Sequence, residues 1–301
     1  MQKRCRLGVA LLSLLVTACG STANRQANTA AAASAVRESG IVYGKGADFE
    51  LKLDLARPAT GGPFPAVVFV FGGGFTSGSR TQWFAEINWA AQRGYVGVAV
   101  DYRLTSLLDE TGRPKYPFPA QVHDVKCAVR WLRANATKYS IDTDRIGVVG
   151  YSAGGTLSLL LALTEPNDGL EGPCGDPSVS SRVQAGVSLA GSPDFVLRHK
   201  ISSYDVELLL GGSPEQVPDR YRVASPLTYV GGHDAPVLTV IGSVDPRLPQ
   251  QRLLDDRMRA AGSDHTLIIV QGAGHSLYGL VNFDKDNPVW GFLDKELKTT
   301  R

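Results

Sequence analysis

The chain has 301 residues, of which 43% are hydrophobic and 20% charged, with a formal net charge of +2. This balance is typical of a globular protein and excludes a disordered or collagen-like chain. Of the 31 basic residues, Lys3, Arg4 and Arg6 lie near the N-terminus, and the remaining 28 nearly balance the 29 acidic residues. A nearly neutral chain without a basic block argues against nucleic acid as a partner.

The first 18 residues are typical of a bacterial export signal. Three basic residues precede the apolar run 7–16, which is too short to span a bilayer. The sequence Val16-Thr17-Ala18-Cys19 resembles a lipobox, in which cleavage precedes the cysteine and its thiol is lipidated. Gly20 follows, not the Asp that retains such lipoproteins in an inner membrane. The resemblance therefore implies a bacterial lipoprotein anchored in the outer membrane, facing the periplasm or the cell surface. The alternative is an ordinary secretory signal.

Residues 19–40 are small and polar, which predicts a flexible tether between the lipid and a folded domain over residues 41–301. Cys5 leaves with the signal and Cys19 carries the lipid, so Cys127 and Cys174 remain. In an oxidising compartment these two thiols are expected to pair. The alternative is that they stay unpaired, one buried in a helix and the other in a loop.

From residue 41 the chain alternates apolar runs with helical patterns. The segment Phe49–Leu55 alternates apolar and polar side chains, which predicts an antiparallel strand with one solvent-exposed face. The spacing of apolar residues predicts a helix over 119–137. Six continuously apolar runs are predicted to be strands buried on both faces: residues 66–71, 95–100, 146–149, 187–190, 237–241 and 267–270.

This alternation predicts an α/β fold, with a mostly parallel sheet covered by helices on both faces. The stretch 193–234, rich in Gly, Pro and Tyr, interrupts the alternation. It is predicted to form a small helical cap over the carboxyl edge of the sheet, where ligands bind in open α/β folds.

The sequence Gly150-Tyr151-Ser152-Ala153-Gly154 carries the clearest chemical signal. A predicted strand ends directly before it, and an apolar helical segment follows. Strand, tight turn and helix make a nucleophile elbow, in which the hydroxyl of Ser152 stands above the sheet. The alternative is a glycine-rich turn with a serine that caps the helix.

A second glycine-rich segment, Phe71-Gly72-Gly73-Gly74-Phe75, follows the predicted strand 66–71. Acyl transfer needs amide donors for the oxyanion that forms on the carbonyl. We expect the amides of Gly73, Gly74 and Ala153 to supply them. A glycine triplet alone is a weak signal, because phosphate loops and plain turns look alike.

The acid and the base are expected after later strands. Asp245 follows the strand 237–241, and His275 follows the strand 267–270. In the chain order Ser, Asp, His, we expect His275 to be the general base for Ser152 and Asp245 to orient it. The other four histidines fit this order less well, and no His-x-x-x-His or Cys-x-x-Cys spacing indicates a metal site.

These motifs resemble the α/β hydrolases of the feruloyl-esterase-like and hormone-sensitive-lipase-like carboxylesterase group. The segments 100–104, 118–125 and 131–135 match stretches that precede the elbow in that group. The resemblance covers nearly all of residues 41–298 and implies an α/β-hydrolase fold. In these segments Asp101, Arg103 and Asp124 are expected to be buried charges with structural partners. The group usually has His where this chain has Phe71, which puts the rigidity of the oxyanion loop in question.

The expected activity is hydrolysis of a small-molecule carboxylic ester through an acylated Ser152, without a cofactor. The resemblance implies small acyl groups on sugars or aromatic acyl esters as substrates. We expect cap residues together with Phe75, Trp83 and Phe84 to line the pocket. One alternative is an amide hydrolase of the arylformamidase type. Another is a non-catalytic, lipid-anchored binding protein on a hydrolase scaffold. The oligomeric state is left open.

Overall fold

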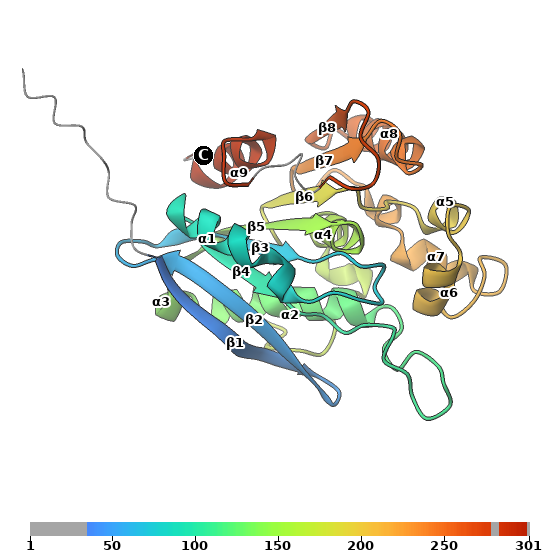
Figure 1. Ribbon diagram of the computed structural model, residues 1–301, viewed down its shortest axis with the longest axis horizontal. Coiled ribbons are helices and arrows are strands. Elements are labelled where there is room, and N and C mark those ends of the chain that lie inside the picture. Colours follow the sequence, from blue (N-terminus) through green and yellow to red (C-terminus); the bar gives the residue numbers. More distant parts are fainter. Residues whose placement is uncertain (1–34, 278–282, 300–301) are drawn as a thin grey trace, which may run out of the picture. The chain divides into compact units, whose positions relative to one another are not determined.

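The computed structural model describes residues 35–277 and 283–299 (Figure 1). The predicted signal sequence and the predicted lipidation site at Cys19 lie outside the described residues. Within this part of the chain, eight strands form one sheet in the order β1-β2-β4-β3-β5-β6-β7-β8. Their bounds are β1 Ala35–Gly46, β2 Phe49–Pro58, β3 Phe64–Val70, β4 Val96–Val100, β5 Ile141–Tyr151, β6 Ala185–Leu189, β7 Val237–Gly242 and β8 His265–Val270.

The sheet is mostly parallel, as predicted. Strand β2 runs antiparallel to β1 and β4, whereas β3 to β8 pair in parallel. Because parallel strands end at the same edge of a sheet, the loops after β3, β5, β7 and β8 meet there. These loops carry the glycine triplet and the three predicted triad residues.

Helices cover both faces of this sheet (Figure 1). In β5, Gly147 packs against α9, and Gly150, which points to the opposite face, packs against α4. The predicted helix 119–137 is α2, followed by the short helix α3. The helical bounds are α1 Phe84–Gln92, α2 Ala120–Ala134, α3 Ala136–Tyr139, α4 Ala153–Leu163, α5 Phe195–His199, α6 Tyr204–Leu210, α7 Pro218–Ala224, α8 Leu248–Ala261 and α9 Pro288–Lys298, with 3₁₀ turns η1 Arg80–Trp83, η2 Pro166–Asp168 and η3 Pro226–Tyr229.

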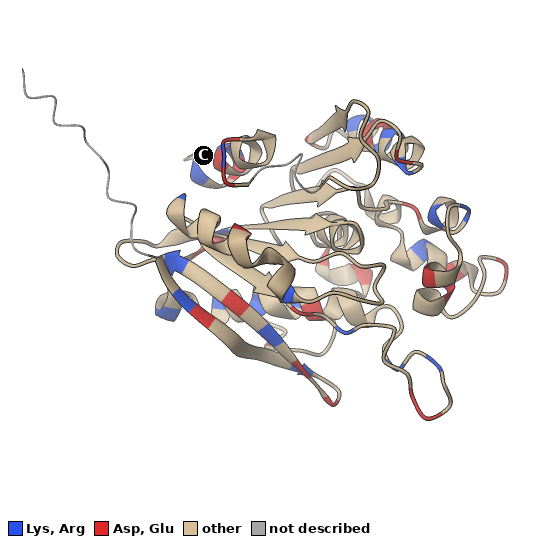
Figure 2. Ribbon diagram, viewed as in Figure 1, with Lys and Arg blue, Asp and Glu red and all other residues tan. Residues whose placement is uncertain are grey.

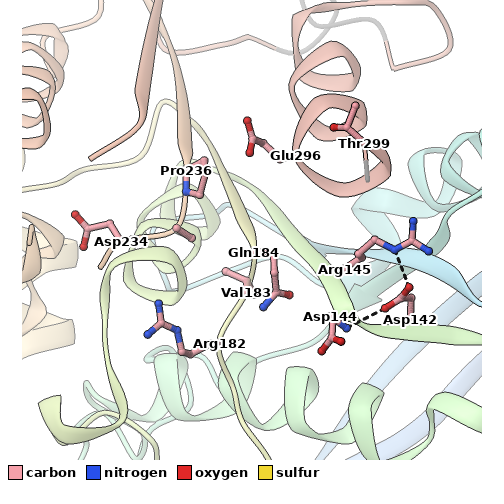
Figure 3. Close-up of a pocket in the computed structure, with 11 residues that line it drawn as sticks. Asp142, Asp144, Arg145, Arg182, Val183, Gln184, Asp234, Pro236, Glu296 and Thr299 are labelled. Carbon is pink, nitrogen blue, oxygen red and sulfur yellow. Dashed lines mark hydrogen bonds and ion pairs between the residues drawn. The ribbon is translucent and has the colours of Figure 1, made fainter. Parts of the chain in front are cut away.

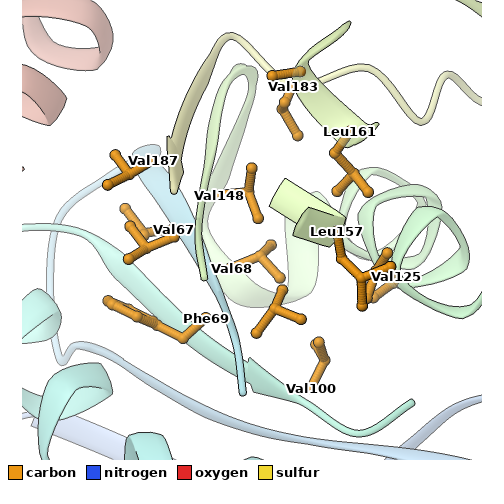
Figure 4. Close-up of a cluster of buried hydrophobic side chains, with 14 of the residues drawn as sticks. Val67, Val68, Phe69, Val100, Val125, Val148, Leu157, Leu161, Val183 and Val187 are labelled. Atoms are coloured by element: carbon orange, nitrogen blue, oxygen red, sulfur yellow. The ribbon is translucent and has the colours of Figure 1, made fainter. Parts of the chain in front are cut away.

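The core lies between the sheet and the helices. Figure 4 shows valines of β3 and β5 packed with Leu157 and Leu161 of α4 and with Val125 of α2. Each of these side chains is at most 2% exposed. Five of the six continuous apolar runs thus form strands buried on both faces, as predicted, and they hold the loops at their carboxyl ends in place. The prediction was wrong for residues 267–270, because β8 is an edge strand and its side chains are only partly buried.

The folded domain begins earlier than predicted. Residues 35–40, assigned above to the tether, belong to β1, where Ala35 lies opposite Pro58 of β2. Strand β1 is at the edge of the sheet and is largely exposed, and Figure 2 shows basic and acidic residues interspersed along β1 and β2. Backbone pairing rather than an apolar face holds these first residues of the edge strand, and residues 35–40 contain no apolar run by which the sequence would reveal them.

Strand β2 is antiparallel as predicted, but its second face is not solvent-exposed. The strand lies between β1 and β4, and helix α1 packs against it. Asp54 on this strand is only 5% exposed. Its carboxylate accepts hydrogen bonds from Nε of Arg80 at 2.9 Å and from the Gly40 amide at 2.8 Å. A polar residue in an alternating pattern is therefore buried here as one half of an ion pair.

Cys127 and Cys174 form a disulfide, which confirms the predicted pairing. Cys127 lies on α2, and its Cα is 5.4 Å from the Cα of Cys174 in the loop after α4. Both sulfur atoms pack against Gly44 of β1, where a larger residue would collide with them. The bond therefore fastens the loop 164–184 to α2 and to the edge of the sheet.

The segment between β6 and β7 contains α5, α6, α7 and η3. Phe195, Leu209 and Tyr221 from these helices are buried. The amide of Phe118 donates to the Leu209 carbonyl at 2.9 Å, which ties the segment to the loop before α2. In the described residues, no helix combines the length and the apolar character that a membrane crossing requires.

Candidate active site

Ser152 occupies a sharp turn between β5 and α4. Its backbone has φ +55° and ψ −115°, a strained conformation for a residue with a side chain. The turn requires glycine on both sides, because a Cβ on Gly150 would collide with the Gly154 carbonyl, and one on Gly154 with the Val70 carbonyl. The turn thus presents Ser152 at the N-terminus of α4, where backbone amides favour negative charge.

His275 joins Ser152 to Asp245. Its Nε2 atom lies 3.0 Å from Oγ of Ser152, and its Nδ1 atom lies 2.8 Å from Oδ2 of Asp245. The Asp245 side chain is fully buried, whereas that of His275 is 34% exposed. The structure therefore brings the three predicted triad residues together, with the carboxylate behind the imidazole and the serine before it. In this geometry His275 can remove the proton from Ser152.

Arg247 holds the other side of the Asp245 carboxylate. The Arg247 amide donates to Oδ1 at 2.8 Å, and Nη1 donates to the same oxygen at 3.1 Å. Burial alone would raise the pKa of Asp245, but the hydrogen bonds from His275 and the Arg247 amide, with the charge of Arg247, lower it below its ordinary value. Asp245 is therefore a carboxylate at neutral pH and can stabilise an imidazolium.

Tyr151 positions the histidine, a role that the sequence analysis missed. Its hydroxyl donates to the His275 carbonyl at 3.0 Å, and its ring stacks on the imidazole with centroids 5.5 Å apart. The position of Tyr151 in the motif could have indicated this role. The residue before the nucleophile is the last residue of β5, and it therefore lies beside the loop after β8 that carries His275.

The glycine triplet forms a tight turn beside Ser152. Gly73 and Gly74 have φ values of +123° and +62°, and the Gly73 carbonyl accepts the Thr76 and Ser77 amides. Among the described residues, the amides of both glycines have no acceptor, and the Ala153 amide is in the unpaired first turn of α4. Gly74 and Ala153 line the cavity at Ser152, while Gly73 lies one residue back in the same turn.

Phe71, which stands where the related group usually has His, is held at the end of β3 by aromatic packing. The Phe71 ring stacks on Tyr102 with centroids 4.1 Å apart and planes inclined by 10°. The Tyr102 hydroxyl donates to the Phe71 carbonyl at 3.1 Å. Both side chains are buried, so packing and this hydrogen bond fix the start of the glycine turn.

The buried charges before the elbow have partners, as expected. Arg103 donates to both carboxylate oxygens of Asp124, from Nη2 at 2.7 Å and from Nε at 2.9 Å. Asp101 accepts from Arg80 at 2.5 Å. These pairs fix the loop after β4 and lie outside the lining of the cavity at Ser152.

The cavity beside Ser152 is small, about 20 Å³. It is lined by Gly74, Phe75, Ser152, Ala153, Thr156, Ser192, Phe195, Arg198, Asp205, Val206 and Arg247. Phe75 and cap residues line it, as expected, but the expectation for Trp83 and Phe84 was wrong. Trp83 is 1% exposed and packs against Phe69 and Phe283 in the core. Phe84 is 55% exposed and lies under Arg37 of β1.

A larger cavity of about 720 Å³ opens elsewhere on the domain (Figure 3). Asp142 and Arg145 at the start of β5 line it, together with residues just before β6 and β7. It therefore lies at the amino edge of the parallel strands, opposite the loops that carry the triad. Several of its charged groups are paired, such as Arg145 with Asp142 at 2.7 Å and Arg182 with Glu165. It holds no nucleophile with a base, and no cluster of metal ligands occurs in the described residues.

Three of the other four histidines have polar partners or lie among buried side chains, and His233 is exposed. His199 lies 2.7 Å from Glu207, and His265 lies 2.8 Å from Asp255. His123 on α2 is largely buried, and its pKa falls to about 4, first through burial and then through the charges of Arg103 and Arg130.

We expect the free energy of unfolding to decrease as the pH falls from about 6.5 to about 4. In this window the unfolded chain protonates His123 at its ordinary pKa, while the folded chain keeps it neutral. The difference should be on the order of 1–2 kcal/mol, given the partial exposure of the ring. Urea unfolding at several pH values should show a shallower dependence for His123→Gln than for the wild type. Equal slopes for the two proteins would contradict the assignment.

Comparison with known proteins places the chain in a family. The BD-FAE family model, which describes feruloyl-esterase-like α/β hydrolases, matches residues 53–255. The chain belongs to the BD-FAE family. The matched segment contains Ser152, Asp245 and the glycine turn, and it bears out the resemblance seen in the sequence.

Relatives of this BD-FAE protein are named as esterases. It is 32% identical to esterase LipC of Mycobacterium tuberculosis over 222 residues, 71% of this chain and 53% of LipC. It is 29% identical to esterase LipQ of the same organism, covering 76% of this chain and 54% of LipQ. The chain thus spans about half the length of the curated relatives it matches.

Solved structures share the fold. The thermophilic esterase Est2 of Thermogutta terrifontis superposes with a TM-score of 0.67 at 29% identity, over 80% of this chain and 83% of Est2. A truncated carbohydrate esterase from gut microbiota superposes with a TM-score of 0.73 at 25% identity, over 89% of this chain and 96% of that one. Like them, the BD-FAE protein described here has the α/β-hydrolase fold.

Proposed function

We propose that this protein is a serine carboxylic-ester hydrolase that acts through an acyl-enzyme. The observation that carries the proposal is the continuous contact from Asp245 through His275 to Ser152, at 2.8 Å and 3.0 Å, beside unpaired amides. A binding protein on a hydrolase scaffold would have no need to retain this arrangement.

The reaction follows from the geometry. Oγ of Ser152 attacks the ester carbonyl while Nε2 of His275 takes its proton, and the amides of Gly73, Gly74 and Ala153 hold the oxyanion. The imidazolium, stabilised by Asp245, then gives its proton to the departing alkoxide. This leaves an alcohol and an acylated serine. Water, deprotonated by His275, attacks the acyl group and releases the acid, and Ser152 takes the proton back.

Short acyl groups fit this site best. The cavity at Ser152 is narrow, and the walls formed by Phe75, Phe195 and Val206 leave less room for a feruloyl ring than for a short acyl chain. Est2 of Thermogutta terrifontis has been solved with propionate and with butyrate bound. We therefore propose esters of acetyl-sized to butyryl-sized acids as substrates, in preference to aromatic acyl esters.

A p-nitrophenyl ester series tests this proposal beside acetylated xylan, a feruloyl ester and an N-formyl amide. We expect kcat/KM to be highest for acyl chains of two to four carbons and to fall at least about tenfold at eight carbons. Faster turnover of the feruloyl ester would contradict the small acyl site. Preference for the N-formyl amide would instead indicate an amide hydrolase.

We further propose that the protein is exported and lipidated at Cys19. The lipobox resemblance supports this, and the Cys127–Cys174 disulfide fits an oxidising compartment outside the cytoplasm. The Cys19→Ala variant should be released from the membrane fraction or remain unprocessed, because it lacks the thiol that accepts the lipid. Fractionation with immunoblotting measures this, and Cys5→Ala is the matched control. Equal membrane attachment of Cys19→Ala and the wild type, with the same processed size on the immunoblot, would refute the proposal.

A further inference from the structure

Two guanidinium groups line the small cavity beside Ser152. Arg198 comes from α5 in the cap segment, and Arg247 immediately precedes α8, two residues after Asp245. Each side chain is only 12% exposed. Arginine is costly to bury without partners, so two of them beside a nucleophile need a physical explanation.

Arg198 has its own counter-charge in the cavity. Its Nη2 atom lies 2.5 Å from Asp205, and Nη1 donates to the Ser202 carbonyl at 3.1 Å. Asp205 also lines the cavity, so it neutralises Arg198 at the same wall. Burial together with the charge of Arg247, opposed by Asp205, lowers the pKa of Arg198.

Arg247 has no such counter-charge in the cavity. Its carboxylate partner, Asp245, is fully buried, does not line the cavity and also holds His275. In the described part of the chain, Nε and Nη2 of Arg247 have no hydrogen-bond partner. The cavity wall thus carries two positive groups and one negative group, with donors of Arg247 unused.

The position of Arg247 also matters during catalysis. Its Nη1 atom lies 3.0 Å from Nδ1 of His275. When His275 takes the serine proton, an imidazolium forms beside the guanidinium, and the like charges repel. Asp245 then has to compensate both cations. A negative group on the substrate would offset this excess charge at the step where it arises.

We propose that the ester substrate carries a carboxylate that binds Arg247, with Arg198 beside it, next to the reacting ester. The unused N–H groups of Arg247 can hold a carboxylate through charge-assisted hydrogen bonds. The proposal rests on the proposed function and adds the charge of the substrate to it. The carboxylate can belong to the acid half of the ester or to the alcohol half. In either case a carboxylate forms the hydrogen bonds with Arg247.

Two matched pairs of esters test the proposal and distinguish these sources. In the first pair, mono-4-nitrophenyl succinate carries a carboxylate on the acid half, and its methyl ester does not. In the second pair, 4-acetoxybenzoate carries a carboxylate on the alcohol half, and its methyl ester does not. Each kcat/KM is divided by the hydroxide hydrolysis rate of the same ester. We expect the charged member of one pair to be favoured at least about tenfold by the wild type.

Variants separate recognition from positioning. Arg247→Met should abolish the preference, whereas Arg247→Lys, which keeps the charge, should retain part of it. Arg222→Gln, which removes an arginine from the exposed surface of α7, is the matched control and should keep the wild-type ratio. If Arg247 only orients Asp245, Arg247→Met will slow both members of each pair equally and leave the ratio unchanged.

Equal use of charged and neutral esters by the wild type would overturn the proposal, as would a preference that survives in Arg247→Met. Turnover of the neutral esters reports separately on the proposed function. If the wild type hydrolyses neither charged nor neutral esters, the proposed function fails and this inference fails with it.

Discussion

Ser152→Ala should lower kcat for a short-chain ester by a factor on the order of 10⁵–10⁶, because it removes the only atom that forms the acyl-enzyme. The substitution removes one hydroxyl from a half-buried turn beside the cavity and keeps the backbone. The melting temperature should therefore stay within about 2 °C of the wild type, because the change opens no cavity in the core. Stopped-flow or steady-state ester assays with circular dichroism measure both quantities.

His275→Ala should cause a loss of similar size, and the double variant should be little worse than either single variant. The two side chains act as a unit, so once the nucleophile is gone, the base has no proton to remove. Ser178→Ala, which removes a hydroxyl from an exposed loop, is the matched control and should keep full activity. Losses that multiply in the double variant, or activity near the wild type in either single variant, would refute the triad.

Loss of the Cys127–Cys174 disulfide should lower the melting temperature by roughly 5–10 °C and leave turnover at 25 °C nearly unchanged. The bond spans 47 residues. Closing a loop of that length in the unfolded chain is worth about 4 kcal/mol, and each kcal/mol shifts the melting temperature of a domain this size by about 2 °C. Turnover should persist because neither cysteine lines the cavity at Ser152.

Calorimetry of the Cys127→Ala/Cys174→Ala double variant measures the change in melting temperature. The Cys127→Ala single variant shows whether an unpaired Cys174 lowers the melting temperature further. Thiol titration of the denatured, unreduced protein is the independent control. Two more reactive thiols per chain in the wild type than in the double variant would mean that the bond does not form in solution. A large fall in kcat for the double variant would instead show that the bond shapes the site.

The sequence was most informative where a short segment determines its own structure. The elbow at Ser152 is such a segment, because a buried strand, a turn with close backbone contacts and an apolar helix each leave a local pattern. Asp245 and His275 could be predicted in the same way, since each follows a buried strand whose carboxyl end meets the others at one edge.

The rest depends on contacts between distant segments, which no local pattern records. Strand β1 pairs through its backbone, and its first six residues are mostly small or charged, so they resembled a tether. Trp83 and Phe84 follow the glycine turn closely in sequence, but one packs into the core and the other faces solvent. Arg198 lines the cavity because α5 lies near the loop that carries Ser152. Arg247 lines it because the chain turns directly after Asp245.

The disulfide also makes the part of the chain that carries Ser152 a closed covalent ring. Strand β5, the elbow and α4 all lie between Cys127 and Cys174, and so does the exposed turn η2. A protease that cuts once at this turn would leave no free fragment, because both sides of the cut stay joined through the sulfur atoms. Such a nicked protein would migrate as one band without reductant and as two with it, while its nucleophile stayed tethered on both sides.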